Sequence, residues 1–373
     1  KKLGGTLKEL GNRIVEQNIL FGLWLEPEAV NEDSELYRVH PDWAITAPGR
    51  KPALGRNQLL LDFSREDVCD YIIDVISKLL VDVPISYIKW DMNRYMSEPF
   101  TRTGTAADQG KIMHKYILGV YDLYNRLTSE FPHILFESCA SGGARFDPAM
   151  LYFAPQAWTS DDTDANERLK IQYGTSMVYP IVSMGSHVSA VPNHQLNRIT
   201  PIDTRADVAY FGTFGYELDL NLLSEKEVER VKKQIAFMKQ YRQLIQVDGD
   251  FYRLLSPFEH NETSWMVVAP DKSEALVGFY QSRNKVNAQW LRLRLTGLDP
   301  DKLYEVSVDC SSLAALDPIL TMIYGIKADG DNTKTYQAYG DELMNAGIVI
   351  DRLNLTIRGG DYSSLIYVLK EVK

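Results

Sequence analysis

Two aspartates of this chain follow apolar runs, at the positions where strands would end. Asp91 comes directly after the run 85–90 (ISYIKW), and Asp161 comes directly after the run 156–160 (QAWTS). If both runs are parallel strands of a barrel, their carboxyl ends meet at the rim where barrel active sites lie. Two facing carboxylates are what glycoside cleavage requires, because one attacks the anomeric carbon while the other protonates the departing oxygen.

Other side chains near these runs could complete such a site. Alternation along a strand puts Lys89 on the same face as Asp91, where its ammonium group would help to keep that carboxylate ionised. Trp24 and Trp158 offer flat apolar surfaces against a sugar ring. The residue types alone leave metal binding and structural ion pairing open as alternative roles for the two carboxylates.

The elements that must position these residues alternate between strand and helix up to about residue 250. Helical patterns cover 65–80, 110–130 and 224–245, and the opening segment 1–17 also reads as a helix. Seven apolar runs are predicted as strands, at 20–25, 59–63, 85–90, 133–137, 156–160, 178–184 and 209–214. Repeated βα units indicate a parallel sheet. We therefore predict an α/β fold with a TIM-type (β/α)8 barrel over residues 1–250, lacking its first strand, which would precede residue 1.

The pattern changes after residue 255, where helical periodicity fades. Short alternating runs separated by turn residues follow, at 264–269, 275–280, 290–295, 303–308, 347–350 and 364–369. Such spacing is typical of antiparallel sheets. We predict a C-terminal antiparallel β-sandwich domain over residues 255–373.

Composition excludes several classes of partner. The formal net charge of −10 argues against a nucleic-acid surface and against a polybasic membrane contact. No window approaches 18 apolar residues, so we expect no transmembrane helix. Cys69, Cys139 and Cys310 are too few and too scattered for a disulfide framework or a zinc site. We expect a cytoplasmic protein that binds no metal.

Five segments carry a more specific signal: 20–30 (LFGLWLEPEAV), 87–95 (YIKWDMNRY), 136–147 (FESCASGGARFD), 157–173 (AWTSDDTDANERLKIQY) and 184–194 (MGSHVSAVPNH). In this order they resemble the bacterial α-galactosidases of glycoside hydrolase family 36. The resemblance implies a retaining enzyme that removes terminal, non-reducing α-galactose from oligosaccharides such as melibiose and raffinose. It implies no metal or organic cofactor, and it implies a homo-oligomer, since relatives often form tetramers.

The resemblance also assigns roles to single residues. It makes Asp91 the catalytic nucleophile and Asp161 the general acid/base. It places six residues around the galactose: Trp24, Arg56, Lys89, Asn93, Cys139 and Gly142. Relatives commonly have asparagine where this chain has Asp162, and we expect that additional carboxylate to point away from the pocket.

Alternative interpretations remain for the protein and for some of its residues. The family fold also serves galactosyltransferases of the raffinose-synthase type. A non-catalytic galactoside-binding fragment is the third possibility, because the aspartates of the family's first barrel strand have no counterpart in this sequence. Glu26 and Glu28 are better explained by ion pairing or loop anchoring than by catalysis. Arg145 and Asp147 are expected to form a local pair.

Overall fold

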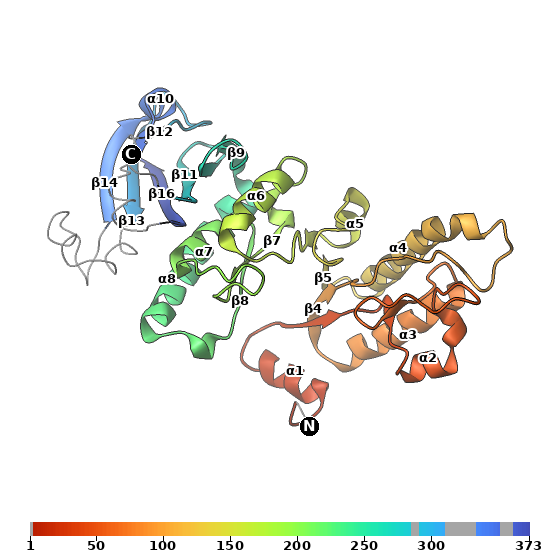
Figure 1. Ribbon diagram of the computed structural model, residues 1–373. Helices are drawn as coiled ribbons and strands as arrows, with labels where there is room; N and C mark the ends of the chain where they lie inside the picture. Colours follow the sequence, from red (N-terminus) through yellow and green to blue (C-terminus); the bar gives the residue numbers. More distant parts are fainter. Residues whose placement is uncertain (1–2, 285–290, 310–332, 351–360) are drawn as a thin grey trace. The chain divides into compact units, whose positions relative to one another are not determined.

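The computed structural model describes residues 3–284, 291–309, 333–350 and 361–373. The chain forms two compact units, Lys1–Asp161 and Asp162–Lys373. Each unit has a hydrophobic core of its own, and the second unit has two. Figure 1 shows the elements of both units along the chain.

The first unit is built on a parallel sheet of four strands in the order β1-β4-β5-β6. These strands are β1 (Phe21–Leu25), β4 (Ile85–Trp90), β5 (Leu135–Ser138) and β6 (Gln156–Ala157). The helices are α1 (Leu7–Val15), α2 (Glu35–Val39), η1 (Pro41–Trp43), α3 (Glu66–Asp82), η2 (Gln109–Lys111), α4 (Ile112–Glu130) and α5 (Pro148–Phe153). The predicted strands at 20–25, 85–90 and 133–137 and the predicted helices at 65–80 and 110–130 are thereby confirmed.

Strand β4 shows why one face of this sheet is polar. Ile88 and Trp90 are fully buried, and the Trp90 ring lies 4.7 Å from that of Tyr124 on α4. Helices α3 and α4 pack side by side and supply the rest of this core (Figure 1). Because successive side chains of a strand point to opposite faces, Lys89 points away from the helices.

The prediction that 59–63 is a strand of the parallel sheet is wrong. Only β3 (Leu59–Leu60) is extended there, and it pairs antiparallel with β2 (Ala29–Val30). Strand β1 instead pairs directly with β4. All five residues of this run are buried, so its apolar character signalled burial correctly but carried no information about the pairing partner.

The second unit begins with further α/β structure. It contains α6 (Ala165–Ser176), η3 (Ile181–Ser183), β7 (Gly185–Ser189), α7 (Ile202–Ala209), β8 (Thr213–Glu217), η4 (Leu220–Leu222), α8 (Glu225–Gln243) and the π-helical turn η5 (Leu244–Asp248). Strands β7 and β8 pair parallel. A capping box between Ser224 and Glu227 fixes the start of α8, which confirms the predicted helix at 224–245.

Two predicted strands of this unit are misplaced. The run 178–184 forms a turn and η3, and the strand follows it at β7; the run 209–214 starts in the last residue of α7, and β8 begins only at Thr213. Ile181, Met184 and Phe211 are buried in the same core although none of them lies in β7 or β8. The hydrophobicity of these residues therefore reflects their burial in the core and does not indicate an extended backbone.

The C-terminal part is an antiparallel sheet, as predicted. Among the residues that the structure describes, six strands form this sheet in the order β14-β13-β16-β11-β10-β9. They are β9 (Asp250–Leu255), β10 (Glu262–Val268), β11 (Glu274–Gln281), β13 (Leu303–Asp309), β14 (Thr333–Tyr339) and β16 (Ser363–Glu371). The short pair β12 (Leu291–Leu293) and β15 (Ile348–Ile350), with α10 (Gly340–Asn345) before β15, shares one hydrophobic core with this sheet.

Candidate active site

Four polar or aromatic residues stand in register across the parallel sheet of the first unit. Trp24 pairs with Lys89, Lys89 with Glu137, and Glu137 with Gln156. Residues paired in parallel strands point to the same face, so these four side chains form a continuous row, here called the polar row. Asp91 follows Lys89 by two positions and therefore continues this face at the carboxyl end of β4.

Asp91 is held by several hydrogen-bond donors. Its backbone N–H donates to the carbonyl of Leu25 at 2.8 Å, which extends the pairing of β1 and β4 by one residue. Its carboxylate accepts the Met92 N–H at 2.8 Å, Asn93 Nδ2 at 2.8 Å and Trp24 Nε1 at 3.1 Å. Asp91 is only 7% exposed. The carboxylate is thus fixed in direction without a cationic partner among these contacts.

These donors control the charge of Asp91. Burial by itself raises the pKa of this carboxyl, but hydrogen bonds from Cys139, Asn93, Trp24 and the Met92 amide outweigh it and lower the pKa below the ordinary value. Burial and the contact with Asp91 raise the pKa of the Cys139 thiol, which therefore stays protonated and can donate. Asp91 is accordingly ionised at neutral pH, as a nucleophile must be.

Asp161 lies four residues beyond β6 and is partly exposed. Its Oδ1 accepts the indole N–H of Trp158 at 3.2 Å. Gly142 packs against its backbone, since a Cβ at Gly142 would stand 2.9 Å from the Asp161 nitrogen. The segment 139–142 after β5 thus reaches both aspartates, with Cys139 on Asp91 and Gly142 beside Asp161.

Glu137 is a member of the polar row that the sequence analysis did not single out. Its side chain is 3% exposed, and its Oε1 lies 3.4 Å from the ammonium of Lys89. Its Oε2 accepts hydrogen bonds from the Tyr87 hydroxyl and, at 3.1 Å, from Gln156 Nε2. In the sequence Glu137 ends the mostly apolar run 133–137, which gives no sign of a functional role. The register of β4 with β5 shows that it faces Lys89.

Lys89 has a different partner from the one expected. We predicted that its ammonium would help to keep Asp91 ionised, but hydrogen bonds make the main contributions there. Lys89 instead pairs with Glu137 and lies over the Trp158 ring, 4.5 Å from the ring centre. This arrangement combines an ion pair with a cation–π contact.

Arg56 and Asn93 line one hollow of about 660 Å³, together with Ala53, Leu54, Gly55, Arg94, Tyr95, Ser97 and Ser141. Asn93 is oriented on three sides: its N–H donates to Glu26 at 3.0 Å, its Nδ2 donates to Asp91, and its Oδ1 accepts the Ser141 hydroxyl at 3.0 Å. Trp24 is 51% exposed, which rules out a role as a core residue. The structure therefore brings these predicted sugar-binding residues to accessible or hollowed positions.

The two glutamates after β1 have structural roles, as expected. Glu28 is completely buried and forms a two-pronged ion pair with Arg145, at 2.9 and 2.6 Å, with further donors from Tyr116 and Trp90. The predicted pair of Arg145 with Asp147 is wrong, because Asp147 caps α5 through the Met150 N–H. A helix cap needs the short side chain at that position, while the long guanidinium reaches the buried carboxylate.

Glu26 anchors loops. Its Oε1 accepts the backbone N–H of Asn93, and its Oε2 accepts Gln58 Nε2 at 3.0 Å. These bonds tie the end of β1 to the segment after β4. Glu26 therefore helps to position Asn93 and carries no free catalytic carboxylate.

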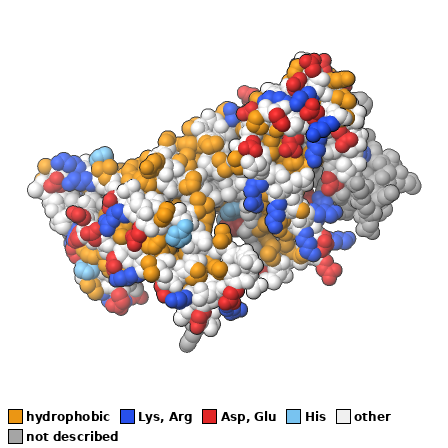
Figure 2. All heavy atoms as spheres, turned by 180° about the vertical axis from the view of Figure 1, so that it is seen from behind, with side chains coloured by type: hydrophobic (Ala, Val, Ile, Leu, Met, Phe, Trp, Pro, Cys, Tyr) orange, Lys and Arg blue, Asp and Glu red, His pale blue; other side chains and the backbone are white. Residues whose placement is uncertain are grey.

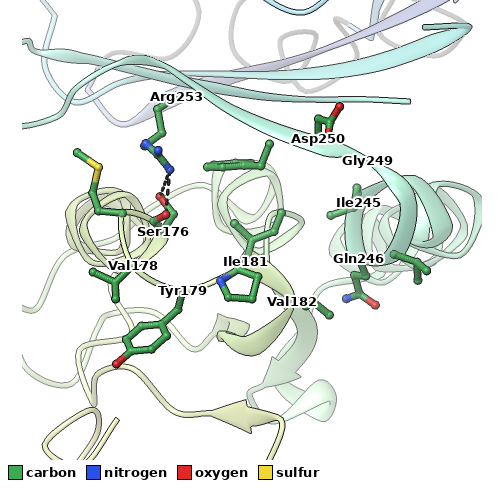
Figure 3. A pocket seen from close by; sticks show the side chains of 14 residues that line it. Ser176, Val178, Tyr179, Ile181, Val182, Ile245, Gln246, Gly249, Asp250 and Arg253 are labelled. Atoms are coloured by element: carbon green, nitrogen blue, oxygen red, sulfur yellow. Dashed lines mark hydrogen bonds between the residues drawn. The ribbon is translucent and has the colours of Figure 1, made fainter. Parts of the chain in front are cut away.

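A second hollow, of about 420 Å³, lies in the other unit between residues 176–182 and 245–253 (Figure 3). Arg253 points toward Ser176 and donates to its carbonyl oxygen at 2.9 Å. Asp250 is the single carboxylate among the residues that line it. It does not offer the pair of carboxylates that glycoside cleavage needs.

Figure 2 shows basic side chains interspersed with acidic ones on the face drawn. Within the described ranges, no cluster of three histidine, cysteine, aspartate or glutamate residues could hold a metal ion. No helix of the described residues combines the length and the apolar character that crossing a bilayer takes. Cys69 and Cys139 are buried and unpaired, and Cys310 lies outside the described residues.

Comparison with known proteins decides the family. Residues 1–248 match the melibiase family, and residues 262–369 match the C-terminal domain of glycosyl hydrolase family 36. This chain belongs to the melibiase family. The resemblance to family 36 α-galactosidases, seen in five sequence segments, is thereby confirmed.

Individual members of the melibiase family are similar over the whole chain. α-Galactosidase AgaA of Geobacillus stearothermophilus is 49% identical over 373 residues, which are 100% of this chain and 47% of that protein. α-Galactosidase Mel36A of Lactobacillus acidophilus is 41% identical over 100% of this chain and 46% of its own length. The chain therefore spans about half the length of these relatives.

Solved structures agree with this assignment. A variant of AgaA in complex with raffinose superposes with a TM-score of 0.88 at 48% identity, covering 99% of this chain and 47% of that one. An α-galactosidase of Lactobacillus brevis gives a TM-score of 0.88 at 45% identity over 99% of this chain and 47% of that one. The fold of this melibiase-family chain is a TIM-type catalytic barrel followed by an antiparallel sheet domain.

Proposed function

We propose that this protein is a retaining α-galactosidase that hydrolyses terminal, non-reducing α-galactose from oligosaccharides such as melibiose and raffinose. One observation carries the proposal: Asp91 is buried, hydrogen-bonded and ionised, and the segment after β5 that contacts it also contacts Asp161. The relatives are named α-galactosidases, and AgaA variants have been solved with raffinose and stachyose.

The spacing of two substituted aspartates supports the same pair. The AgaA variant solved with raffinose carries an Asp-to-Asn substitution, and the variant solved with stachyose carries an Asp-to-Ala substitution. These two positions are 70 residues apart in AgaA, which is also the separation of Asp91 and Asp161. We assign Asp91 as the nucleophile and Asp161 as the general acid/base on these grounds.

The reaction proceeds in two balanced steps. First, an Asp91 carboxylate oxygen forms a bond to the anomeric carbon, the glycosidic C–O bond breaks, and the proton of Asp161 moves to the leaving oxygen. Second, Asp161 takes a proton from water, the water oxygen bonds to the anomeric carbon, and Asp91 departs. Two inversions give net retention of the α configuration.

The galactose ring would be bound by the remaining residues that surround this pair. We place Trp24 against the ring and the polar groups of Lys89, Asn93 and Arg56 on its hydroxyls. Cys139 and Gly142 would line the wall beside the two aspartates. The half-exposed Trp24 and the hollow shared by Arg56 and Asn93 support this placement.

The wider organisation is part of the proposal. We place the catalytic barrel at residues 1–250 and a β-sandwich at 255–373, a division supported by the change from helix to antiparallel strand at Asp250. We propose a cytoplasmic setting, which the two unpaired buried cysteines support, and a homo-oligomer that would be detected by light scattering. The reaction as written uses no metal or organic cofactor.

Hydrolysis of a nitrophenyl α-galactoside tests the proposed activity. The wild-type protein should release nitrophenol and galactose, and Asp91→Asn should release neither at a measurable rate. Product analysis at high sugar concentration separates this function from a transferase, which would yield mainly lengthened oligosaccharides. Binding of melibiose by a folded wild-type protein without turnover would contradict the proposal and favour a binding function.

A further inference from the structure

Three contacts link Glu137 to the candidate acid/base. The Glu137 carboxylate pairs with the Lys89 ammonium at 3.4 Å, and that ammonium lies 4.5 Å from the centre of the Trp158 ring. The indole N–H of Trp158 then donates to Asp161 Oδ1 at 3.2 Å. All four residues belong to the first unit: Lys89 lies on β4, Glu137 lies on β5, and Trp158 and Asp161 follow β6.

From these contacts we infer that Glu137 is a positioning residue for the proposed reaction, and that it orients the Asp161 carboxyl through Lys89 and Trp158. The inference rests on the proposed function, because it explains how the acid/base is aimed. Glu137 touches no reacting atom in this account. Glu137 instead restrains the Lys89 ammonium, which in turn contacts the indole ring of Trp158.

The surroundings of Glu137 suit such a role. The two oxygens of its carboxylate are used differently: Oε2 is fixed by the Tyr87 hydroxyl and by Gln156, while Oε1 is directed to Lys89. An ionised carboxylate is costly to bury unless a partner compensates it. The Glu137 carboxylate has one ion pair and two hydrogen bonds on the sheet face that carries Asp91, whereas a residue needed only for core packing could be apolar.

Lys89 is constrained by both of its neighbours. A lysine side chain has four rotatable bonds and would sample many positions if it were unpaired. The Glu137 carboxylate, 3.4 Å from the Lys89 ammonium, and the Trp158 ring, whose centre lies 4.5 Å away, restrict the positions that this side chain can take. Since small displacements of a catalytic group cost large factors in rate, removing this constraint should be visible in the proton-transfer step.

The test uses Glu137→Gln and a series of aryl α-galactosides whose leaving phenols differ in pKa. Glutamine has the same shape and can keep the bonds to Tyr87 and Gln156, but it lacks the charge that holds Lys89. A good leaving group departs without proton donation, whereas a poor one depends on Asp161. We expect kcat/KM to fall about 10- to 100-fold more for the poorest leaving group than for dinitrophenol, whose smaller loss reports the weaker binding of galactose by a freed Lys89. The plot of log kcat/KM against leaving-group pKa would then become steeper.

Three further variants extend the test. Trp158→Phe keeps an aromatic ring but removes the indole N–H, so it should give the same steeper plot. In the double variant the two losses should not multiply, because they break one chain of contacts. Glu28→Gln is the matched control: it also removes a buried carboxylate, from the Arg145 pair, and it should lower stability while leaving the slope unchanged.

An equal loss of kcat/KM for every leaving group in Glu137→Gln would overturn the inference, since Glu137 would then serve only sugar binding or stability. If the wild-type protein hydrolyses no α-galactoside, the proposed function fails. The inference is then tested by comparing crystal structures of the wild type and Glu137→Gln. In that case Lys89 should leave the Trp158 ring in Glu137→Gln, with loss of the Trp158–Asp161 hydrogen bond. Both contacts persisting unchanged would overturn the inference independently of activity.

Discussion

Gly142 stands so close to Asp161 that no side chain fits between them. A Cβ at Gly142 would lie 2.9 Å from the Asp161 nitrogen and 2.9 Å from the Ser160 α-carbon. The backbone of Gly142 also has a positive φ of 82°, a conformation that glycine adopts without strain. The turn after β5 therefore fixes the position of the Asp161 backbone, from which the candidate acid/base side chain extends.

Replacing Gly142 with alanine should displace the backbone at Asp161. We expect a loss of kcat of at least about 10-fold on raffinose, because a misplaced proton donor protonates the leaving oxygen less effectively while the glycosidic bond breaks. Gly49→Ala is the matched control: Gly49 also has a positive φ, of 73°, but nothing lies within 4 Å of its missing Cβ. Both variants should lose about 1 kcal/mol of stability from backbone strain, Gly142→Ala should lose more because its Cβ also meets the backbone of residues 160 and 161, and only Gly142→Ala should lose activity. Equal activities of Gly142→Ala and Gly49→Ala would show that the contact between Gly142 and Asp161 does not position the acid/base.

Cys139 should control the acidic limb of the pH profile. Its thiol hydrogen bond is one of the contacts that lower the pKa of Asp91, so Cys139→Ala should raise that pKa. A raised pKa means that Asp91 becomes protonated earlier as pH falls, and the acidic limb of kcat/KM should move to higher pH. At neutral pH the loss should stay within about 10-fold, the scale of one hydrogen bond. Cys139→Ser keeps a donor and should keep the limb in place; identical limbs in all three proteins would exclude this role.

Azide separates the roles of the two aspartates. In Asp91→Gly, azide can enter from the face that the carboxylate has left, and a nitrophenyl α-galactoside should give β-galactosyl azide. In Asp161→Gly, azide should displace Asp91 from the galactosyl-enzyme and give α-galactosyl azide, while hydrolysis of raffinose falls about 10²- to 10⁴-fold. Product configuration is measured by NMR. The opposite pair of products would require the two assignments to be exchanged.

A partly buried carboxyl on α7 should make the second unit sensitive to pH. Asp207 accepts the Ser364 hydroxyl at 2.6 Å, and burial raises its pKa to about 8. Because this folded-state pKa exceeds that of the unfolded chain, its contribution to stability is fully present below about pH 4 and is lost as pH rises through 8. Asp207→Asn removes this titration and should exceed the wild type by about 2–5 kcal/mol at pH 8.5.

Urea unfolding between pH 5 and 9 checks this prediction. The decline in unfolding free energy from pH 5 to 8 should be shallower in Asp207→Asn than in the wild type. Asp203→Asn provides the comparison, because it breaks the 2.7 Å ion pair with Arg230 and should lower stability without removing the Asp207 titration. The same decline in all three proteins would mean that Asp207 is not the titrating group.

The sequence predicted the elements better than their pairing. Periodicity was sufficient for α3, α4 and α8, and for β1 and β4, because each has a regular apolar face bounded by polar residues. It failed at 59–63, where a buried run pairs antiparallel with Ala29–Val30, because hydrophobicity reports burial and not partners. It also failed near 178–184, where turn residues fill the core.

The candidate site, too, was predictable only where it did not depend on strand pairing or turn geometry. Asp91 and Asp161 could be found from the sequence because each follows an apolar run at the end where barrel chemistry occurs. Glu137 could not, because its meaning depends on the register of β4 with β5, which pairs it with Lys89. The hydrogen bond from Cys139 to Asp91 likewise depends on a turn geometry that spacing alone does not specify.

The configuration of the first galactose released shows whether Asp91 forms a covalent intermediate. Hydrolysis of a nitrophenyl α-galactoside by the wild-type protein would be followed by proton NMR from the first minute, before the sugar mutarotates. Attack by Asp91, followed by water activated by Asp161, predicts that α-galactose forms first and that the β anomer appears only later. If β-galactose forms first, water has attacked the substrate directly, and the covalent role of Asp91 is contradicted.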